Sequence, residues 1–474
     1  MLKFNDYPNA DRVFFYFEEI SKVPHGSFNT APIADYLESF AKSRSLDYVR
    51  DAADNVVIKK NATKGFESRP TVIIQGHTDM VAEKTADSDK NLETDGLELY
   101  VDGDFLRAKG TTLGGDDGVA VAYMLALLES ETIPHPALEM LFTSNEEVGL
   151  LGADALDVSN LKGKIMINVD SDDEGIFTVG CAGGARVDFT LPVKRDTASG
   201  KCYELTVSNL LGGHSGVEID KCRANAIKLG SNILAALGEV RIVSLDGGTK
   251  DNAIPRDFTA KFTTEFGIGG IFEEAKTSAL KAYKDIEPYA KVTLSECECD
   301  FNALDTDSSK TVISALREIK SGVIAMSEDI KGLVESSENL GIAKLSENEF
   351  NFTVSVRSAK ADKKAMLIEN LKEIANKFGA EVSVRGEYPA WEYKKESHIR
   401  DTACKVFSDM YGKDAKVITI HAGLECGIFS DKIEGLDCIS LGPDNNDIHT
   451  TEEHLSISST ARVWDFIKNV LKEI

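Results

Sequence analysis

The chain has 474 residues, which is too long for one ordinary hydrophobic core and indicates more than one domain. It is 42% hydrophobic and 28% charged, and no apolar run approaches the roughly 18 residues that span a bilayer. The formal net charge of −25 argues against nucleic-acid binding, which needs a basic face. The composition therefore predicts a multidomain globular protein with neither a membrane nor a nucleic acid as its partner.

The start of the chain bears on cellular location. Its first residues, MLKFNDYPNADRVFFYFEEI, lack the basic segment and the small-residue cleavage site of a signal peptide. We therefore expect a cytoplasmic protein.

Segments typical of buried strands alternate with helical patterns. Four of them place an apolar run ahead of a polar turn: RPTVIIQGHTDM, HPALEMLFTSNEE, KIMINVDSDDEG and LDCISLGPDNND. Residues 117–131 and 458–474 repeat apolar residues at helical spacing. Strands that alternate with helices predict an α/β fold with a mostly parallel sheet.

The middle of the chain follows a different order. From about residue 190 the predicted elements run β-α-β-β-α-β, from CYELTVSN to AKVTLSE, which is a ferredoxin-like α+β pattern. A similar but less complete order follows, up to AEVSVRGE. We therefore predict a first domain formed by residues 1–189 and 389–474. A second domain, residues 190–388, is inserted into it and has two similar halves.

Polar residues follow the predicted α/β strands at the points where these strands end. They are His77 and Asp79, Glu146 and Glu147, Asp170, and His449 in a later loop, while Asp116 opens the helix at 117. In open α/β sheets, ligands bind outside the carboxyl ends of the strands, so these side chains can converge on one crevice. Carboxylates gathered in this way would repel one another unless a cation held them.

Two histidines and three carboxylates suit a pair of metal ions better than a single one. Two ions about 3.5 to 4 Å apart can share a bridging carboxylate, which we assign to Asp116 because its glycine-rich turn allows close approach. The remaining ligands are His77, Glu147, Asp170 and His449. Asp79 has the right identity to orient the His77 imidazole. We expect zinc, although such ligands also accept manganese or cobalt.

The adjacent Glu146 and Glu147 can divide two tasks. Neighbouring side chains at a strand end diverge, so Glu147 can bind metal while Glu146 serves as general base. The alternative for such a pair is a solvated loop. DSDDEG also invites interpretation as a calcium loop, but its twelfth position is Cys181, where a bidentate Glu is needed.

Six motifs in this order resemble a known enzyme family: GHTDMV, GGDDGVA, TSNEEVGLLGA, NVDSDDEG, GGHSG and SLGPDNNDIH. They are similar to those of the co-catalytic zinc peptidases, which include aminoacylase, carboxypeptidase G and bacterial dipeptidases. KVPHGSFNTAPIADYLESFAKSRSLD, VGCAGGARVDFTLPV and HAGLECGIFSDKI further resemble the aminoacyl-histidine dipeptidases (peptidase D) within that family. The resemblance covers nearly the whole chain.

The resemblance implies the same ligands, Asp79 as orienting acid, Glu146 as base and a cis peptide after Asp116. It makes the inserted domain a lid whose histidine, matched by His214, stabilises the oxyanion of the reaction. Asn252 and Arg357 match residues that grip the substrate carboxylate. Without the resemblance, His214 is equally well a turn histidine and Arg357 a surface charge. Glu425 is either a counter-charge for the substrate or a structural residue.

Two features depart from the simplest pattern. The bridge is followed by Asp117, where many relatives of this subgroup carry Asn, so extra negative charge is expected beside the metals. The lid is also nearly twice the length of the simple dimerising kind. His214 then acts within one chain if the lid halves mimic a dimer, and otherwise in the partner of a homodimer.

These observations predict a metal-dependent dipeptidase with a small peptide as substrate. We expect cleavage of Xaa-His dipeptides such as β-alanyl-histidine, by attack of metal-activated water with Glu146 as general base. The alternatives are a broader dipeptidase, a tripeptidase or an N-acyl amino acid deacylase of the same family. A non-catalytic metal- or peptide-binding protein is a further alternative, but it would have no need of Glu146.

Overall fold

The computed structural model describes residues 6–328 and 330–474, which form two compact units. The first, here called the α/β unit, contains the chain up to Cys181 together with Tyr393–Thr419 and Leu424–Ile474. The second, the lid unit, contains Ala182–Glu392 and the short segment Ile420–Gly423. An insertion of one unit into the other agrees with the sequence pattern, although the boundaries differ.

The predicted boundary after residue 189 is wrong because it cuts through a strand. β9 (Gly183–Pro192) pairs along its whole length with β18 (Glu349–Ser358) in the lid unit. The second boundary follows Glu392 rather than residue 388. The segment Ile420–Gly423 also belongs to the lid unit, where the Ile420 carbonyl accepts a hydrogen bond from the Ala182 N–H at 3.1 Å.

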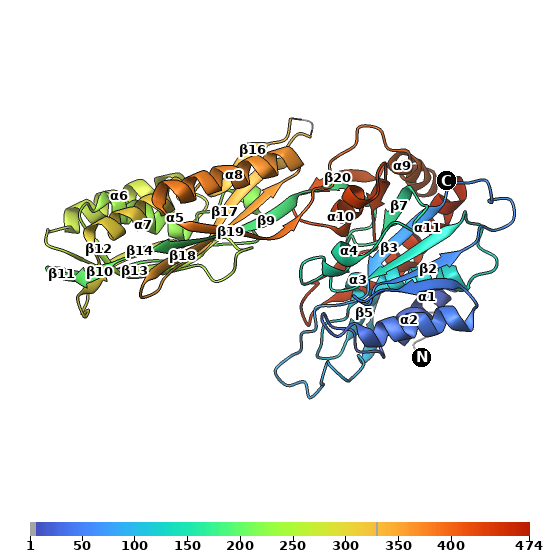
Figure 1. Ribbon diagram of the computed structural model, residues 1–474. Coiled ribbons are helices and arrows are strands. Elements are labelled where there is room, and N and C mark those ends of the chain that lie inside the picture. Colours follow the sequence, from blue (N-terminus) through green and yellow to red (C-terminus); the bar gives the residue numbers. More distant parts are fainter. Residues whose placement is uncertain (1–5, 329) are drawn as a thin grey trace. The chain divides into compact units, whose positions relative to one another are not determined.

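An eight-stranded sheet forms the centre of the α/β unit (Figure 1). Its order is β1 (Asp47–Arg50), β2 (Val56–Lys60), β6 (Leu138–Thr143), β3 (Val72–His77), β7 (Ile165–Asn168), β21 (Asp437–Ser440), β8 (Ile176–Cys181) and β20 (Lys416–Ile420). The strands predicted from sequence are β3, β6, β7 and β21, which are neighbours and parallel to one another. The flanking pairs β1–β2, β2–β6 and β21–β8 are antiparallel.

Helices pack on this sheet because its central strands are apolar on both faces. Every residue of β3 and β6 is buried. The helices of the unit are α1 (Asp11–Ile20), α2 (Ala31–Ser43), α3 (Gly115–Glu129), α4 (Leu151–Ala155), α9 (His398–Tyr411), α10 (Glu425–Lys432) and α11 (Ile457–Glu473). α3 is apolar on all sides and lies between α1 and β3. A small antiparallel sheet of β22 (Asn445–Asn446), β23 (His454–Ser456), β5 (Phe105–Ala108) and β4 (Leu99–Asp102) completes the unit.

The lid unit is built on a nine-stranded antiparallel sheet. Its order is β14 (Lys291–Glu296), β11 (Lys201–Ser208), β13 (Phe258–Thr264), β12 (Arg241–Gly247), β17 (Val334–Leu345), β18, β9 and β19 (Glu381–Tyr388), with β16 (Gly322–Met326) beside β17. Figure 1 shows the helices α5 (Ala226–Ala236), α6 (Gly269–Leu280), α7 (Thr306–Glu318) and α8 (Ala361–Phe378) along one face. β10 (Arg195–Thr197) and β15 (Asn302–Leu304) form a separate pair.

The strand order explains the two halves predicted for the lid. β14-β11-β13-β12 is the 4-1-3-2 order of a ferredoxin-like unit. β19-β9-β18-β17 repeats this order, with β9 as its first strand and α7 and α8 as its helices. The first half is therefore inserted after β9 of the other half, and this interruption is why the sequence pattern showed only part of that half. Among the described residues of both units, no helix combines the length and the apolar character needed to cross a membrane.

Candidate metal centre and catalytic site

Asp116 lies between two histidines at the carboxyl edge of the parallel strands. Its Oδ1 is 2.9 Å from His77 Nε2, and its Oδ2 is 3.1 Å from His449 Nε2. His77 is the last residue of β3, whereas His449 lies in the loop between β22 and β23 with φ of 62°. One carboxylate thus faces two imidazoles with different oxygens, which is the arrangement of a bridging ligand.

Each histidine faces a second carboxylate. Asp170 Oδ1 is 3.9 Å from His77 Nε2, and Glu147 Oε1 is 3.0 Å from His449 Nε2. Candidate ligand atoms within 4.8 Å of one another form three groups: His77, Asp116 and Asp170; Asp116, Glu147 and His449; and His77, Glu146 and Glu147. The first two groups share Asp116. The structure thus brings all five predicted ligands together, with one histidine and one further carboxylate on each side of Asp116.

The charges of this cluster fit a pair of divalent cations. Burial raises the pKa of Asp170 well above its ordinary value, and its buried Oδ2 has no hydrogen-bond partner among the described residues. Glu147 Oε1 is also buried, and it lies 3.0 Å from His449 Nε2. Hydrogen bonds with Asp116 and Glu147 raise the pKa of His449 to about 10. Imidazole nitrogens and unsatisfied carboxylate oxygens are donors that zinc, manganese and cobalt accept.

Asp79 lies beside His77 with both its backbone carbonyl and its carboxylate. The His77 Nδ1 contacts the backbone carbonyl of Asp79 at 2.9 Å, whereas the Asp79 carboxylate is 3.6 Å away. That carboxylate accepts the backbone N–H of Glu146 at 2.9 Å and the hydroxyl of Ser27 at 2.8 Å. Asp79 thus connects His77, the last residue of β3, to the glutamate pair that follows β6.

Glu146 stands beside the ligand set without belonging to the two groups that share Asp116. Burial raises the pKa of the Glu146 carboxyl to about 8, the His77 charge opposes this shift, and Glu425 and Glu147 add to it. A carboxylate whose proton affinity is increased in this way is a stronger base than an exposed Glu. The backbone N–H of Glu146 donates to the Asp79 carboxylate, which fixes the backbone from which the Glu146 side chain extends.

The turn that carries Asp116 has two distinctive features. The peptide between Asp116 and Asp117 is cis, as the resemblance implied. Asp117 is buried, and its Oδ2 accepts the backbone N–H of His77 at 3.2 Å. Burial raises the pKa of Asp117 well above its ordinary value. Asp117 therefore braces the end of β3, and its raised pKa favours the neutral acid over the extra negative charge expected from the sequence.

Glu425 lies inside the α/β unit and has no exposed surface. Its Oε2 accepts hydrogen bonds from Gln75 Nε2 at 2.5 Å and from Thr143 Oγ1 at 2.7 Å. Asn168 in turn donates to Gln75 Oε1 at 2.7 Å. Burial raises the pKa of Glu425 to about 7. These contacts favour the structural alternative for Glu425 over contact with substrate, because the carboxylate joins side chains of the central strands.

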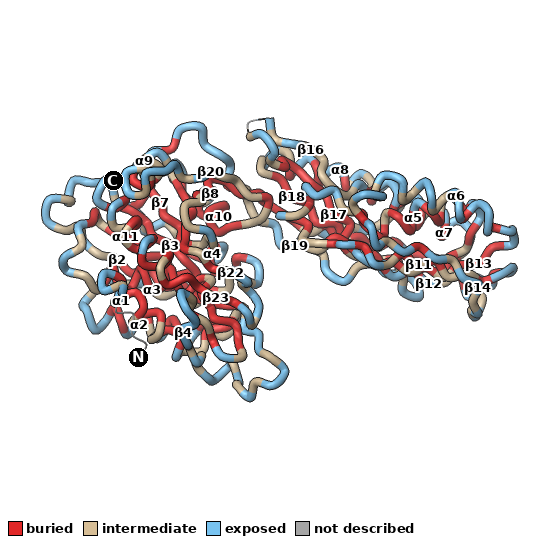
Figure 2. The backbone as a smooth tube through the Cα atoms, turned by 180° about the vertical axis from the view of Figure 1, so that it is seen from behind, coloured by how far each residue is buried: buried red, intermediate tan, exposed pale blue. Residues whose placement is uncertain are grey.

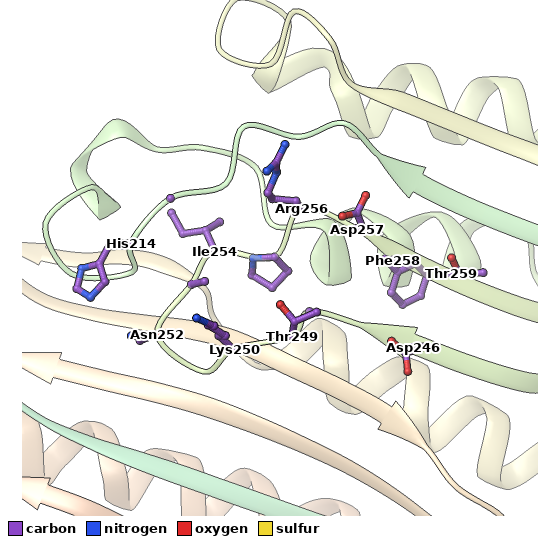
Figure 3. A pocket seen from close by; sticks show the side chains of 14 residues that line it. His214, Asp246, Thr249, Lys250, Asn252, Ile254, Arg256, Asp257, Phe258 and Thr259 are labelled. Carbon is purple, nitrogen blue, oxygen red and sulfur yellow. The ribbon is translucent and has the colours of Figure 1, made fainter. Parts of the chain in front are cut away.

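His214 and Asn252 lie together in the lid unit. The Ser215 N–H donates to the Asn252 carbonyl at 2.8 Å, and His214 and Asn252 line a hollow of about 460 Å³ (Figure 3). His214 Nδ1 accepts the N–H groups of Gly216 and Val217 at 3.2 Å. Because Nδ1 is the acceptor, a neutral His214 carries its proton on Nε2. Burial and the Arg357 charge lower the pKa of His214, which favours this neutral donor.

Arg357 is buried in the lid sheet rather than exposed as a surface charge. Only 6% of the residue is accessible, its Nη1 donates to Tyr388 Oη at 2.8 Å, and its Nε has no partner among the described residues. Its charge lowers the pKa of both His214 and His421, after the larger effect of burial. A buried cation with an unused donor is suited to an anionic group of a ligand.

The prediction from sequence missed several residues that surround these groups. Glu453 binds the backbone of the Asp116 turn, and Ser27 binds Asp79. His421 contacts Ser337 Oγ through Nε2 at 2.7 Å in the lid. Ser27 and His421 lie in two of the segments that carry the resemblance, KVPHGSFNT and HAGLECG, so proximity to these motifs was an available signal. Glu453 gave no signal, since TTEEH is typical of a solvated loop.

The chain matches the model of peptidase family M20/M25/M40 over residues 73–473, and it belongs to this family. It is 33% identical to the cytosol non-specific dipeptidase of Escherichia coli (strain K12), over 97% of this chain and 96% of that protein. The crystal structure of the aminoacylhistidine dipeptidase from Vibrio alginolyticus matches with a TM-score of 0.90 and 33% identity, over 98% and 96% of the two chains. A tripeptidase from Staphylococcus aureus shares the fold, with a TM-score of 0.56, 18% identity and coverage of 98% and 99%.

Proposed function

We propose that this member of the family is a metal-dependent dipeptidase that cleaves Xaa-His dipeptides. The observation that carries the proposal is the pair of ligand groups that share Asp116, next to Glu146. The likeness to the Vibrio alginolyticus aminoacylhistidine dipeptidase over nearly the whole chain supports the substrate class. We further propose that the enzyme is cytoplasmic, as the name of the Escherichia coli relative indicates for that protein.

His77 and Asp170 would hold one cation, Glu147 and His449 the other, and Asp116 both. When bound there, the cations supply Lewis acidity that polarises the peptide carbonyl and acidifies a water molecule. Glu146 takes the proton of the attacking water and delivers it to the leaving nitrogen. Its raised pKa of about 8 in the metal-free cluster reflects the desolvation of its carboxyl.

We assign contacts with the oxyanion and with the free carboxylate of the substrate to residues of the lid unit. His214 presents a neutral Nε2–H, which is a donor for the oxyanion that develops during attack. Arg357 offers its charge, and Asn252 its amide, to the free carboxylate of a dipeptide. A requirement for that carboxylate would restrict the enzyme to short peptides.

The experiment is hydrolysis of β-alanyl-histidine beside Leu-Gly, a tripeptide and an N-acetyl amino acid. Metal-stripped protein is assayed alone and after addition of Zn²⁺ or Mn²⁺. Metal-dependent cleavage that favours the histidine dipeptide supports the proposal. Turnover of the tripeptide or the acetylated substrate alone contradicts the substrate class, and no turnover of any substrate by metal-loaded protein contradicts the enzymatic role.

A broader dipeptidase is the second candidate. The name of the Escherichia coli relative, a non-specific dipeptidase, favours it. In the same assay, comparable kcat/KM for Leu-Gly and β-alanyl-histidine would identify the broader enzyme.

A further inference from the structure

Glu453 directs its carboxylate into the turn that carries the bridging Asp116. Only 3% of Glu453 is exposed. Its Oε2 accepts the backbone N–H groups of Leu113 and Gly114 at 2.7 and 2.9 Å. Its Oε1 accepts those of Gly115 and Asp116 at 2.8 and 3.2 Å. A side chain more than 300 positions away thus satisfies four consecutive amides at the start of α3.

We propose that Glu453 is a positioning residue for the metal centre, which fixes the turn 113–116 so that the Asp116 carboxylate faces both histidines. This inference rests on the proposed function, because it assumes that Asp116 bridges two cations. The Glu453 carboxylate binds the backbone of the turn and not the Asp116 side chain, so it acts through that backbone.

The backbone of the turn is suited to an external anion because it is not helical at Gly114 and Asp116. Gly114 has φ of 67°, and Asp116 has φ and ψ of −84° and 103°, so neither continues the helix. Successive N–H groups in such a turn form a concave site for an anionic oxygen. A Cβ added at Gly115 would lie 3.1 Å from Glu453 Oε1 and 2.9 Å from the Asn445 amide. The turn is therefore built around the Glu453 carboxylate, with no room for a side chain at position 115.

The same carboxylate links the loops that carry the other ligands. Glu453 follows His449 by four residues in one loop, and Asn445 Nδ2 donates to Glu453 Oε1 at 3.3 Å. The backbone N–H of Asn445 donates to the Asp172 carbonyl at 3.0 Å, two residues after Asp170. Loss of the Glu453 contacts should consequently disturb both cation positions rather than one.

The test is Glu453→Gln, which preserves size but turns an NH₂ group toward two backbone N–H groups. Glu139→Gln is the matched control. Glu139 is also buried in the α/β unit, and its carboxylate accepts the backbone N–H groups of Lys162 and Gly163 at 2.9 and 3.0 Å. It lies near the start of β6, whereas Glu146 and Glu147 follow the end of that strand.

Metal-stripped proteins are titrated with Co²⁺, followed by visible absorbance and by competition with a chelator. We expect Glu453→Gln to weaken Co²⁺ binding about 10- to 100-fold and to change the absorption spectrum. Glu139→Gln should keep the affinity and spectrum of the wild type, even if it is less stable. Wild-type affinity and spectrum in Glu453→Gln would overturn the proposal.

Asn445→Ala decides the question if Glu453→Gln does not fold. It removes one hydrogen bond to the same carboxylate, and we expect Co²⁺ affinity to fall several-fold, whereas unchanged affinity would contradict the proposal. The proposed function fails separately if the wild type binds only one Co²⁺ ion or does not hydrolyse the dipeptide. If the wild type hydrolyses the dipeptide and Glu453→Gln binds Co²⁺ normally, the positioning role is refuted while the proposed function stands.

Discussion

The α/β unit and the lid unit place their functional side chains in different ways. In the α/β unit the candidate ligands follow strands whose residues are buried on both faces, so the polar groups lie in the loops beyond them. The lid sheet carries helices on one face, and β11 alternates between buried and more accessible residues (Figures 1 and 2). There Arg357 belongs to a strand, and His421 packs on Ser337 of another.

This difference teaches that metal binding and proton transfer are assigned to one unit, and contacts with the peptide and its oxyanion to the other. Strand ends of a doubly covered sheet bring charged groups of several loops to one place, which suits cations and proton transfer. The lid strands carry polar side chains within the strands themselves, such as the buried Arg357, and such groups suit contacts with a peptide. Substitutions in the two units should therefore change different measurable quantities.

The largest effect is expected for Glu146→Gln in the α/β unit. Loss of the general base should lower kcat for the preferred dipeptide about 1,000-fold. Co²⁺ affinity and unfolding free energy should remain near those of the wild type, because Glu146 lies outside the two ligand groups that share Asp116. Steady-state kinetics and Co²⁺ titration measure both quantities, and unchanged kcat would refute the base assignment.

A smaller effect is expected for His214→Asn in the lid. The Asn amide oxygen can replace Nδ1 as the acceptor for Gly216 and Val217, but it has no donor at the position of Nε2. We expect kcat to fall about 100-fold with little change in KM, and His214→Gln to recover part of the loss. The exposed His398 provides the control, as His398→Gln.

Mixing the two inactive variants addresses which chain His214 serves. Activity that returns when Glu146→Gln and His214→Asn proteins are mixed would mean that the lid of one chain completes the site of another. Activity that stays lost after subunit exchange would mean that each lid serves its own chain.

The smallest effect concerns the pH dependence of lid stability. Burial, together with the Arg357 charge, lowers the pKa of His421 from 6.5 to about 3. Between these values the unfolded chain binds a proton that the folded chain does not, so the unfolding free energy decreases as the pH falls. From pH 7 to pH 5 the loss should be about 2 kcal/mol.

His421→Gln keeps a polar group for Ser337 but cannot titrate, so its stability should fall less over this range. Urea unfolding can be followed by the fluorescence of Trp391 in the lid unit, with Trp464→Phe in both proteins because Trp464 lies in the α/β unit. Equal losses of stability in the two proteins would contradict the shifted pKa of His421.

Three of the five candidate ligands were predictable from sequence because they end or follow strongly apolar strands. His77, Glu147 and Asp170 come after runs that are buried on both faces, and parallel strands bring their carboxyl ends to one edge. The glycines around Asp116 also marked a backbone under unusual constraint. The roles of His214, Asn252 and Arg357 depended on the resemblance to the family, because a polar residue in a turn or at a strand end has no distinctive pattern.

The sequence did not predict the strands β9 and β17 or the contacts of Glu453, and the reasons differ. β9 begins with two glycines, which indicate a turn rather than a strand. β17 begins Val-Glu-Ser-Ser-Glu-Asn and is nevertheless buried, because side chains such as Ser336 and Asn339 find hydrogen-bond partners from distant segments. Sequence patterns measure hydrophobicity, so they cannot identify a polar strand whose partners lie elsewhere in the chain. Glu453 was missed because its partners are backbone amides of a distant turn, which no local pattern records.

The sequence by itself determined the alternation of strands and helices, the ferredoxin-like order of the first lid half and which residues are candidate metal ligands. These depend on local periodicity and on the direction of buried strands. The tertiary structure alone decided which ligand faces which histidine, that Glu425 is enclosed, that Asp79 binds His77 through its carbonyl and that Glu453 holds the Asp116 turn. The physical reason is that a hydrogen bond between distant residues requires a particular distance and angle, which only the packed chain provides.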